Sequence, residues 1–135
     1  MTTSPLVSKV EEFMHVMLNS FDKVGDYISD DFVWINHLPD HIPFGGEYHG
    51  IAGLTDYFGR IAAALELGPI EFDEFYVAQD DTVIVTGAER DTLVKATGKR
   101  YTMPFVWVFR FDAAGKLAYL REHNDTLPIS VAFEG

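Results

Sequence analysis

Hydrophobic residues recur every three or four positions near the start of the chain, which is the spacing of a helix that packs on a core. The first such stripe follows Ser4 and Pro5, a pair typical of a helix start. It consists of Leu6, Val10, Phe13, Met17 and Phe21. The same spacing predicts a short helix over residues 22–29 and a third helix over residues 50–67, which a Gly-Pro pair ends.

Alternation of polar and apolar positions predicts strands in most of the remaining chain. One strand is expected over residues 32–37, and a loop rich in proline and glycine follows it. After the third helix, short turns separate four more strands, over residues 70–78, 82–94, 99–111 and 116–126. Consecutive strands joined by short turns form an antiparallel meander. We therefore predict an α+β fold, with the helices packed on one face of the sheet, formed by one domain over residues 1–135.

The strand over residues 99–111 is apolar on both faces, although a sheet exposed to water on one side should alternate. One face carries Tyr101, Met103, Phe105, Trp107, Phe109 and Phe111. The other face carries Pro104, Val106 and Val108. If the helices cover one face, the other needs a second cover. We therefore predict a homodimer that forms through the outer face of the sheet.

The last predicted strand carries a row of polar and ionisable side chains on one face. These residues are Tyr119, Arg121, His123 and Asp125, and they lie opposite Leu120, Glu122 and Asn124. A row of this kind inside a cupped sheet requires hydrogen-bond partners or a chemical role, because burial of unpaired polar groups is costly. This row is therefore the first candidate for the functional face.

The formal net charge of −11 narrows the classes of partner. A nucleic-acid-binding protein needs a basic face, and an anionic membrane surface would repel an acidic chain. The charge suits a neutral or cationic ligand. Aromatic residues make up 14% of the chain, which suits a packed core or a pocket lined with rings. We therefore expect a small hydrophobic or aromatic ligand, and neither nucleic acid nor a membrane, as the partner.

The chain has no cysteine, which excludes disulfide bonds, a thiolate nucleophile and zinc held by cysteine. His37, Asp40, His41 and His49 gather around the loop, but Pro39 disfavours the helix on which such a histidine pair would bind a metal. We predict no metal site.

The segment Met1–Leu6 has neither a basic region nor a long apolar run, so no secretory leader is expected. No apolar stretch approaches the roughly 20 residues that a membrane-spanning helix needs. A cytoplasmic location is the default expectation.

Five short motifs accompany this order of helices and strands. They are Asp30-Asp31-Phe32-Val33-Trp34, Glu47-Tyr48-His49-Gly50, Thr97-Gly98-Lys99, Gly115-Lys116-Leu117 and Arg121-Glu122-His123-Asn124-Asp125. Over essentially the whole chain, this layout resembles the nuclear transport factor 2-like superfamily, and specifically its SnoaL-like polyketide cyclase branch. The resemblance implies a cone-shaped, cystatin-like α+β barrel. In it, a curved antiparallel sheet wraps around three helices, a pocket opens at one end, and the outer sheet face forms dimers.

The resemblance also implies a reaction. In the SnoaL-like cyclases, an acidic residue near the end of the last strand takes a proton next to a carbonyl, and the matching position here is Asp125. A carboxylate in an apolar cup is poorly solvated and suited to this task. The family therefore implies a cofactor-free enzyme with Asp125 and His123 as its catalytic residues. Its substrate would be a hydrophobic, carbonyl-bearing cyclic molecule, and the reaction a cyclisation, isomerisation or dehydration.

Two related families test this interpretation. Ketosteroid isomerases place a base at the position of Asn36, and an amide cannot act as a base; their oxyanion donor is a tyrosine of the first helix, which this helix lacks. Limonene epoxide hydrolases use a first-strand Tyr and Asn, for which this chain has Trp34 and Asn36. They also use an Arg and an Asp on one face of the second meander strand. Arg90 and Asp91 are neighbours and point oppositely unless a bulge intervenes, so the sequence leaves open which of Glu89, Arg90 and Asp91 faces the pocket.

The side chains expected to line the pocket are mostly large and apolar. They are Trp34, Phe58, Met103, Phe105 and Trp107, with Asn36 and Arg121 as polar contacts. The first alternative to an enzyme is a non-catalytic ligand-binding or interaction module, and the second is an activity like that of an epoxide hydrolase. An open pocket with Asp125 at its floor would favour the enzyme, and an interior filled with aromatic rings would favour the module.

Overall fold

The computed structural model describes residues 4–135, so part of the Met1–Leu6 segment lies outside the described residues. The elements are α1 (Pro5–Asn19), η1 (Phe21–Asp26), β1 (Ile28–Asn36), β2 (Gly46–His49), α2 (Gly50–Ala64), β3 (Leu65–Glu66), β4 (Ile70–Ala78), β5 (Thr82–Val94), β6 (Arg100–Phe111), β7 (Leu117–Asn124) and α3 (Thr126–Phe133). The α+β class and the meander β4–β7 are thus confirmed. No helix within residues 4–135 is long and apolar enough to cross a membrane.

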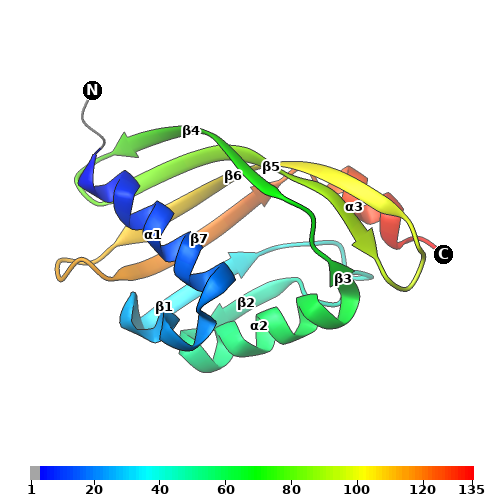
Figure 1. Ribbon diagram of the computed structural model, residues 1–135, viewed down its shortest axis with the longest axis horizontal. Helices are drawn as coiled ribbons and strands as arrows, with labels where there is room; N and C mark the ends of the chain where they lie inside the picture. Colours follow the sequence, from blue (N-terminus) through cyan, green and yellow to red (C-terminus); the bar gives the residue numbers. More distant parts are fainter. Residues whose placement is uncertain (1–3) are drawn as a thin grey trace.

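The sheet is a single curled layer with the order β2-β1-β7-β6-β5-β3, and β4 also pairs with β5. Figure 1 shows this sheet curving around α1 and α2. The prediction of a wholly antiparallel sheet is wrong in one place, because β1 pairs with β7 in parallel. The chain leaves β1 through β2 and α2 before the meander begins, and this long connection allows the first and last strands to run in the same direction.

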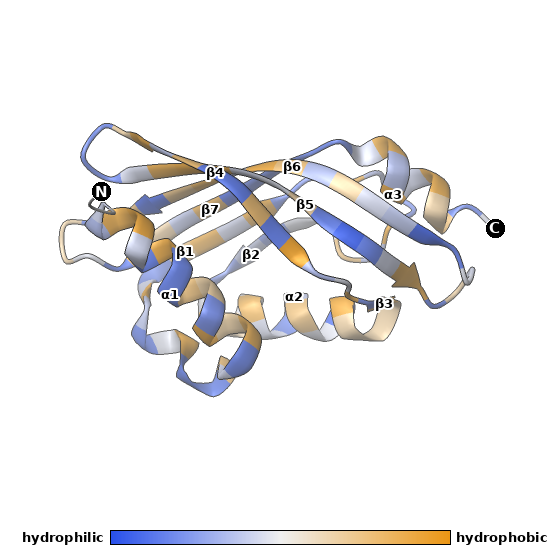
Figure 2. Cartoon of the chain, turned by 45° about the horizontal axis from the view of Figure 1, so that its top comes forward, coloured by the Kyte–Doolittle hydropathy of each residue, from blue (hydrophilic) through white to orange (hydrophobic). Residues whose placement is uncertain are grey.

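The helices on the concave side bury one face each. Ser4 caps α1 by accepting a hydrogen bond from the Leu6 amide at 3.3 Å, and Pro5 occupies the first turn, as the sequence predicted. Phe13 of α1 is fully buried and contacts the rings of Trp34 and Phe109. Figure 2 shows hydrophobic and hydrophilic residues alternating along α1 and α2, as expected of helices that pack on a core from one side.

Several boundaries differ from those predicted. The short second helix is a 3-10 helix that ends at Asp26, and β1 begins at Ile28. The third predicted helix ends at Ala64, because Leu65 and Glu66 pair with β5 as β3. The largest difference is α3, which occupies residues predicted as the end of a strand and the tail beyond it. Asp125 begins this helix as its N-cap.

Candidate functional site

A cavity lies between the concave face of the sheet and helices α1 and α2. It holds about 480 Å³ of space not filled by atoms, counting the part that opens to solvent. Its mouth lies where Leu18 at the end of α1 and Leu67 after β3 are both partly exposed. Most of the wall is apolar, and the polar side chains on it are Asn36, Tyr57, Glu89, Trp107 and Glu122.

Five of the predicted contact residues line this cavity. They are Trp34, Asn36, Phe58, Met103 and Trp107. Phe105 does not line it, and that prediction is wrong. Its ring is buried on the same face of β6, stacked on Trp107 with 4.3 Å between ring centroids, and does not border the cavity. Phe105 therefore supports the Trp107 ring from the side.

The predicted polar row on β7 faces away from the cavity. His123 is exposed and pairs with Val106 on the outer face of the sheet, where Arg121 also lies opposite Val108. Asp125 is exposed, and its carboxylate accepts a hydrogen bond from the Leu127 amide at 3.3 Å as the cap of α3. The placement of Asp125, His123 and Arg121 in the pocket is therefore wrong.

The physical reason lies in the pairing of β7 with β1. Trp34 pairs with Leu120, and Asn36 pairs with Glu122. Paired residues point to the same side of a sheet, so Leu120 and Glu122 share the inner face with Trp34 and Asn36. The sequence contains a sign of this arrangement, since the apolar Leu120 lies two residues before Glu122 and therefore on the same face of the strand. The prediction instead chose the opposite face, because that face carries the row of ionisable side chains.

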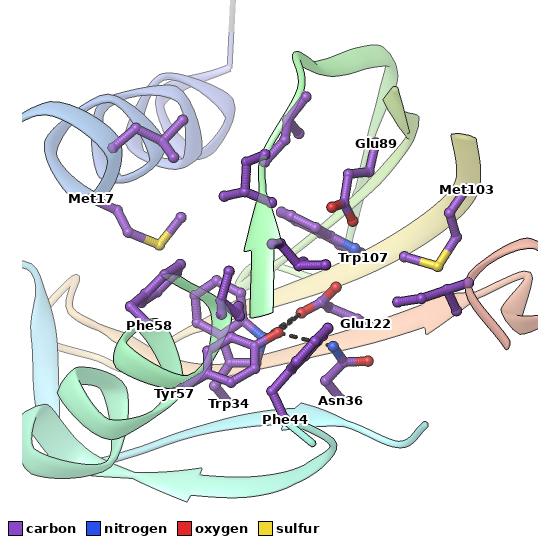
Figure 3. A pocket seen from close by; sticks show the side chains of 16 residues that line it. Met17, Trp34, Asn36, Phe44, Tyr57, Phe58, Glu89, Met103, Trp107 and Glu122 are labelled. Carbon is purple, nitrogen blue, oxygen red and sulfur yellow. Dashed lines mark hydrogen bonds between the residues drawn. The ribbon is translucent and has the colours of Figure 1, made fainter. Parts of the chain in front are cut away.

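Glu122 is the centre of a buried hydrogen-bond network (Figure 3). Its Oε2 accepts hydrogen bonds from Trp34 Nε1 and from the Tyr57 hydroxyl, each at 2.7 Å. Asn36 Nδ2 donates to the same hydroxyl at 2.9 Å, and Asn124 Nδ2 donates to Asn36 Oδ1 at 2.9 Å. The other oxygen of Glu122, Oε1, has only the distant Asn124 Nδ2 at 3.5 Å within residues 4–135. One oxygen is thus fixed, and the other remains free to react.

Burial changes the acidity of this network. Desolvation raises the pKa of Glu122 to about 7, and the hydrogen bonds from Tyr57 and Trp34 limit the rise. Desolvation, together with the nearby Glu122 charge, raises the pKa of Tyr57 well above its usual value, so its hydroxyl stays a donor at neutral pH. A carboxyl group with a pKa near the working pH can both take and return a proton.

A second carboxylate, Glu89 on β5, faces the same cavity by regular alternation, and a bulge that follows it brings Thr92 to the same side. Glu89 pairs with Met103 and Thr92 pairs with Tyr101, so two residues of β5 lie opposite one residue of β6. In a regular strand, Glu89 and Thr92 would point to opposite faces. The bulge turns Thr92 inward beside Glu89, whose Oε1 accepts hydrogen bonds from Tyr101 Oη at 3.0 Å and Thr92 Oγ1 at 3.2 Å.

The bulge also settles which residues of this segment face outward. Arg90 forms an ion pair with Glu71 at 3.0 Å, and Asp91 forms one with Arg100 at 3.7 Å, all with exposed side chains. Asp91 occupies the left-handed backbone region, with φ of 48°. Because neither Arg90 nor Asp91 reaches the cavity, the arrangement of an epoxide hydrolase is not present. Desolvation raises the pKa of Glu89, and its two hydrogen bonds oppose this rise.

Trp107 adds a polar group that has no partner. It lines the cavity and is 4% exposed, and its Nε1 is buried without a hydrogen bond within residues 4–135. A buried N–H donor without an acceptor is uncommon and costs free energy. This donor is therefore available to an acceptor atom of a bound molecule.

The histidines near the loop do not form a metal centre with their neighbours. His41 contacts the Ser130 carbonyl at 3.1 Å, and His49 lies 3.6 Å from Glu47. In the part of the chain that the structure describes, no group of three or more His, Asp or Glu side chains is placed to hold a metal ion.

Solved structures of the same fold cover nearly the whole chain. An NTF2-like protein from Burkholderia xenovorans is 27% identical, with a TM-score of 0.81 and coverage of 99% of each chain. TerC, co-crystallised with polyporic acid, is 20% identical, with a TM-score of 0.77 and coverage of 98% of this chain and 100% of its own. A candidate SnoaL-like polyketide cyclase from Mesorhizobium loti is 20% identical, with a TM-score of 0.67 and coverage of 91% and 99%.

The last two similarities, at 20% identity, show the fold alone, and no curated protein matches the sequence. The family model of the SnoaL-like domain matches residues 10–120, which is most of the chain. The match includes β1, α2, β5 and β6, and ends within β7. The curled mixed sheet, the concave cavity and this match agree, and the chain belongs to the SnoaL-like domain family.

Proposed function

We propose that this protein is a small-molecule enzyme that uses cofactor-free acid–base chemistry on a hydrophobic, carbonyl-bearing cyclic substrate, with Glu122 as the base. One observation carries the proposal: a buried carboxylate lines an apolar cavity with one oxygen fixed and the other without a close partner. The proposal keeps the reaction class implied by the family and moves the base from Asp125 to Glu122.

The surroundings of Glu122 suit proton transfer. The pKa near 7 leaves a substantial fraction of the side chain ionised at neutral pH, and the apolar wall solvates that charge poorly. Trp34 and Tyr57 hold Oε2 in place, which directs Oε1 toward a bound substrate. A positioned general base of this kind typically contributes a factor of about 10² to 10⁴ to the rate.

Trp107 supplies the second requirement of such a reaction, a donor for the oxygen on which negative charge develops. In the proposed step, Glu122 Oε1 takes a proton from the carbon beside the carbonyl. The electron pair of the C–H bond moves into the carbonyl, and the enolate oxygen accepts a hydrogen bond from Trp107 Nε1. In a substrate with a double bond next to the enolate, return of the proton to the far carbon of the dienolate completes an isomerisation. In a substrate with a second carbonyl, the enolate carbon attacks it, and the proton held by Glu122 passes to the new alkoxide to complete a cyclisation.

The experiment that tests this proposal is proton exchange in D₂O. A flat bicyclic ketone such as 2-tetralone has acidic C–H groups next to its carbonyl, and NMR follows their replacement by deuterium. We expect the protein to accelerate exchange, and Glu122→Gln to slow it by about 10² or more. Asp125→Asn, which keeps a good helix cap, serves as the matched control and should exchange at the wild-type rate.

Two results would contradict the proposal: exchange that Glu122→Gln leaves unchanged, or no acceleration of any cyclic ketone tested. The second result would favour the alternative, a non-catalytic ligand-binding module. The edge-on packing of Trp34 against Phe58 and Trp107 favours this alternative, because it fills part of the interior with rings. In that case, the hydrogen bonds of Glu122 would serve only to satisfy a buried carboxylate.

A further inference from the structure

Glu89 is a buried carboxylate that the proposed reaction does not use. Its side chain lines the cavity and is 9% exposed. Oε1 accepts two hydrogen bonds, from Tyr101 and Thr92, whereas Oε2 accepts none within residues 4–135. Figure 3 shows the carboxylates of Glu89 and Glu122 both pointing into the cavity. The site therefore offers a fixed acceptor oxygen that lacks a donor.

No positive charge compensates this acceptor from inside the cavity. None of the cavity-lining side chains in the described part of the chain is Lys, Arg or His. The neighbouring cation, Arg90, faces the outside and pairs with Glu71 there. A desolvated carboxylate without a cation is unfavourable, and a ligand that brings the missing charge would relieve this cost.

The rest of the wall also suits a cation. Aromatic rings surround the cavity, from Trp34, Phe44, Tyr57, Phe58 and Trp107. The faces of such rings carry partial negative charge and attract ammonium groups. Trp107 lines the same cavity, and its unpartnered Nε1 could donate a hydrogen bond to an acceptor atom on the ligand. Together, these groups match a flat ring system that carries both an oxygen acceptor and a protonated amine.

We propose that Glu89 is a specificity-determining residue that binds the ammonium group of an amine-bearing cyclic ligand, with Oε2 accepting the N–H hydrogen bond. This assignment rests on the proposed function, because it places the amine on the substrate of the same cavity. The net charge of −11 acts in the same direction, since it raises the local concentration of cations around the protein. An anionic ligand would meet two carboxylates and no counter-charge.

Binding of two matched probes tests the proposal. The amine 2-aminotetralin is protonated at neutral pH, and 2-hydroxytetralin has the same ring system without charge. Both tryptophans of the chain line the cavity, so intrinsic fluorescence reports binding there directly. We expect the amine to bind at least about tenfold more tightly than the alcohol, the size of a charge-assisted hydrogen bond to a buried group.

Glu89→Gln keeps an acceptor for Tyr101 and Thr92 and removes the charge, so it should bring the affinity for the amine down to that of the alcohol. Glu74→Gln, which removes one exposed charge from β4, is the matched control and should keep the full preference. Near-ultraviolet circular dichroism verifies that each variant is folded. Equal affinity of the wild-type protein for the two probes would overturn the proposal even if Glu89→Gln fails to fold.

Three results would overturn the proposal: equal affinity for the two probes, no binding of the amine at millimolar concentration, or a preference that persists in Glu89→Gln and disappears in Glu122→Gln. Ketone exchange provides the separate readout for the proposed function. If exchange fails while the amine preference holds, only the role of Glu122 is wrong. If exchange depends on Glu122 while the two probes bind equally, only the role of Glu89 is wrong.

Discussion

The Tyr57 hydroxyl donates to Glu122 Oε2 at 2.7 Å and accepts from Asn36 Nδ2 at 2.9 Å, so it joins the candidate base to the polar end of β1. Tyr57 comes from α2, and Glu122 comes from β7 of the sheet. The contact therefore fixes both the position of α2 on the sheet and the acidity of the carboxyl group.

Tyr57→Phe should separate these two effects. Removal of the hydroxyl takes away a hydrogen bond that lowers the pKa of Glu122, so this pKa should rise and the pH midpoint of ketone exchange should move upward. Loss of the buried hydrogen bond should also cost about 1–2 kcal/mol of stability. The pH–rate profile and urea denaturation measure the two changes. A stability loss without a shift of the midpoint would show that Tyr57 has only a structural role.

The stability of the protein should depend on pH through Glu122. Its pKa is about 7 in the folded state against a usual 4.5, so the folded state holds the proton more tightly than the unfolded state. The contribution of Glu122 to the free energy of unfolding is therefore complete below pH 4.5. It is lost as pH rises through 7, which lowers the free energy of unfolding by up to about 3 kcal/mol. Burial of Glu89 acts in the same direction. Urea denaturation at pH 5 and pH 8 should show this difference, and Glu122→Gln should reduce it; an unchanged difference in the variant would contradict the assignment.

Asp125→Ala tests the corrected role of the residue that the family resemblance placed at the catalytic centre. The loss of a helix cap should destabilise the protein by about 1 kcal/mol through α3. Exchange of the ketone should keep its wild-type rate, because Asp125 does not reach the cavity. A large loss of exchange at unchanged stability would return Asp125 to the site.

The bulge beside Glu89 packs closely against Gly68. A Cβ at this position would lie 1.8 Å from the carbonyl oxygen of Arg90, and the backbone cannot yield to it cheaply. Gly68→Ala should therefore destabilise the fold by about 1–3 kcal/mol and weaken amine binding. Gly59→Ala is the matched control, since a Cβ there meets nothing within 4 Å on helix α2, and it should stabilise the helix by about 0.5–1 kcal/mol. Thermal unfolding of both variants decides the point.

The outer face of the sheet should form a homodimer, as its apolar strand predicted. Val106 on β6 is 38% exposed and Tyr76 on β4 is 49% exposed, and both belong to this face. Val106→Asp places a charge there and should shift the protein to monomer in sedimentation velocity at micromolar concentration. Asp73→Asn on β4, at an exposed position, serves as a control. A wild-type protein that sediments as a monomer would contradict this prediction.

The spacing of apolar residues predicted the fold well, because most helices here repeat them every three or four positions and most strands alternate them with polar residues. Alternation put Trp34 and Asn36 on one face of β1, the family resemblance implied that this face lines the pocket, and both residues line the cavity. The parallel pairing of β1 with β7 could not be read from local patterns, because it joins segments far apart in the chain. That pairing decides which face of β7 is buried, and so the identity of the candidate base.

Two further features, the role of Asp125 and the bulge in β5, could not be predicted because the local sequence does not distinguish the alternatives. Asp125 satisfies the rules for a strand end and for a helix cap equally, and only the apolar residues of α3, such as Ile129, favour the second. The hydrogen bond from Thr92 to Glu89 requires the extra residue in β5, which neither a turn motif nor a proline marks in the sequence. Strand alternation assumes regular pairing, so it fails wherever a bulge changes the count.

The irregularity in β5 has a consequence for how a cavity of this kind can change in evolution. Insertion of a single residue beside Thr102 of β6 would match the extra residue of β5, restore regular pairing and place Glu89 and Thr92 on opposite sides of the sheet. No side chain would be exchanged, yet either the acid or its hydroxyl partner would leave the interior. Insertion is therefore as direct a route to a new ligand preference here as substitution.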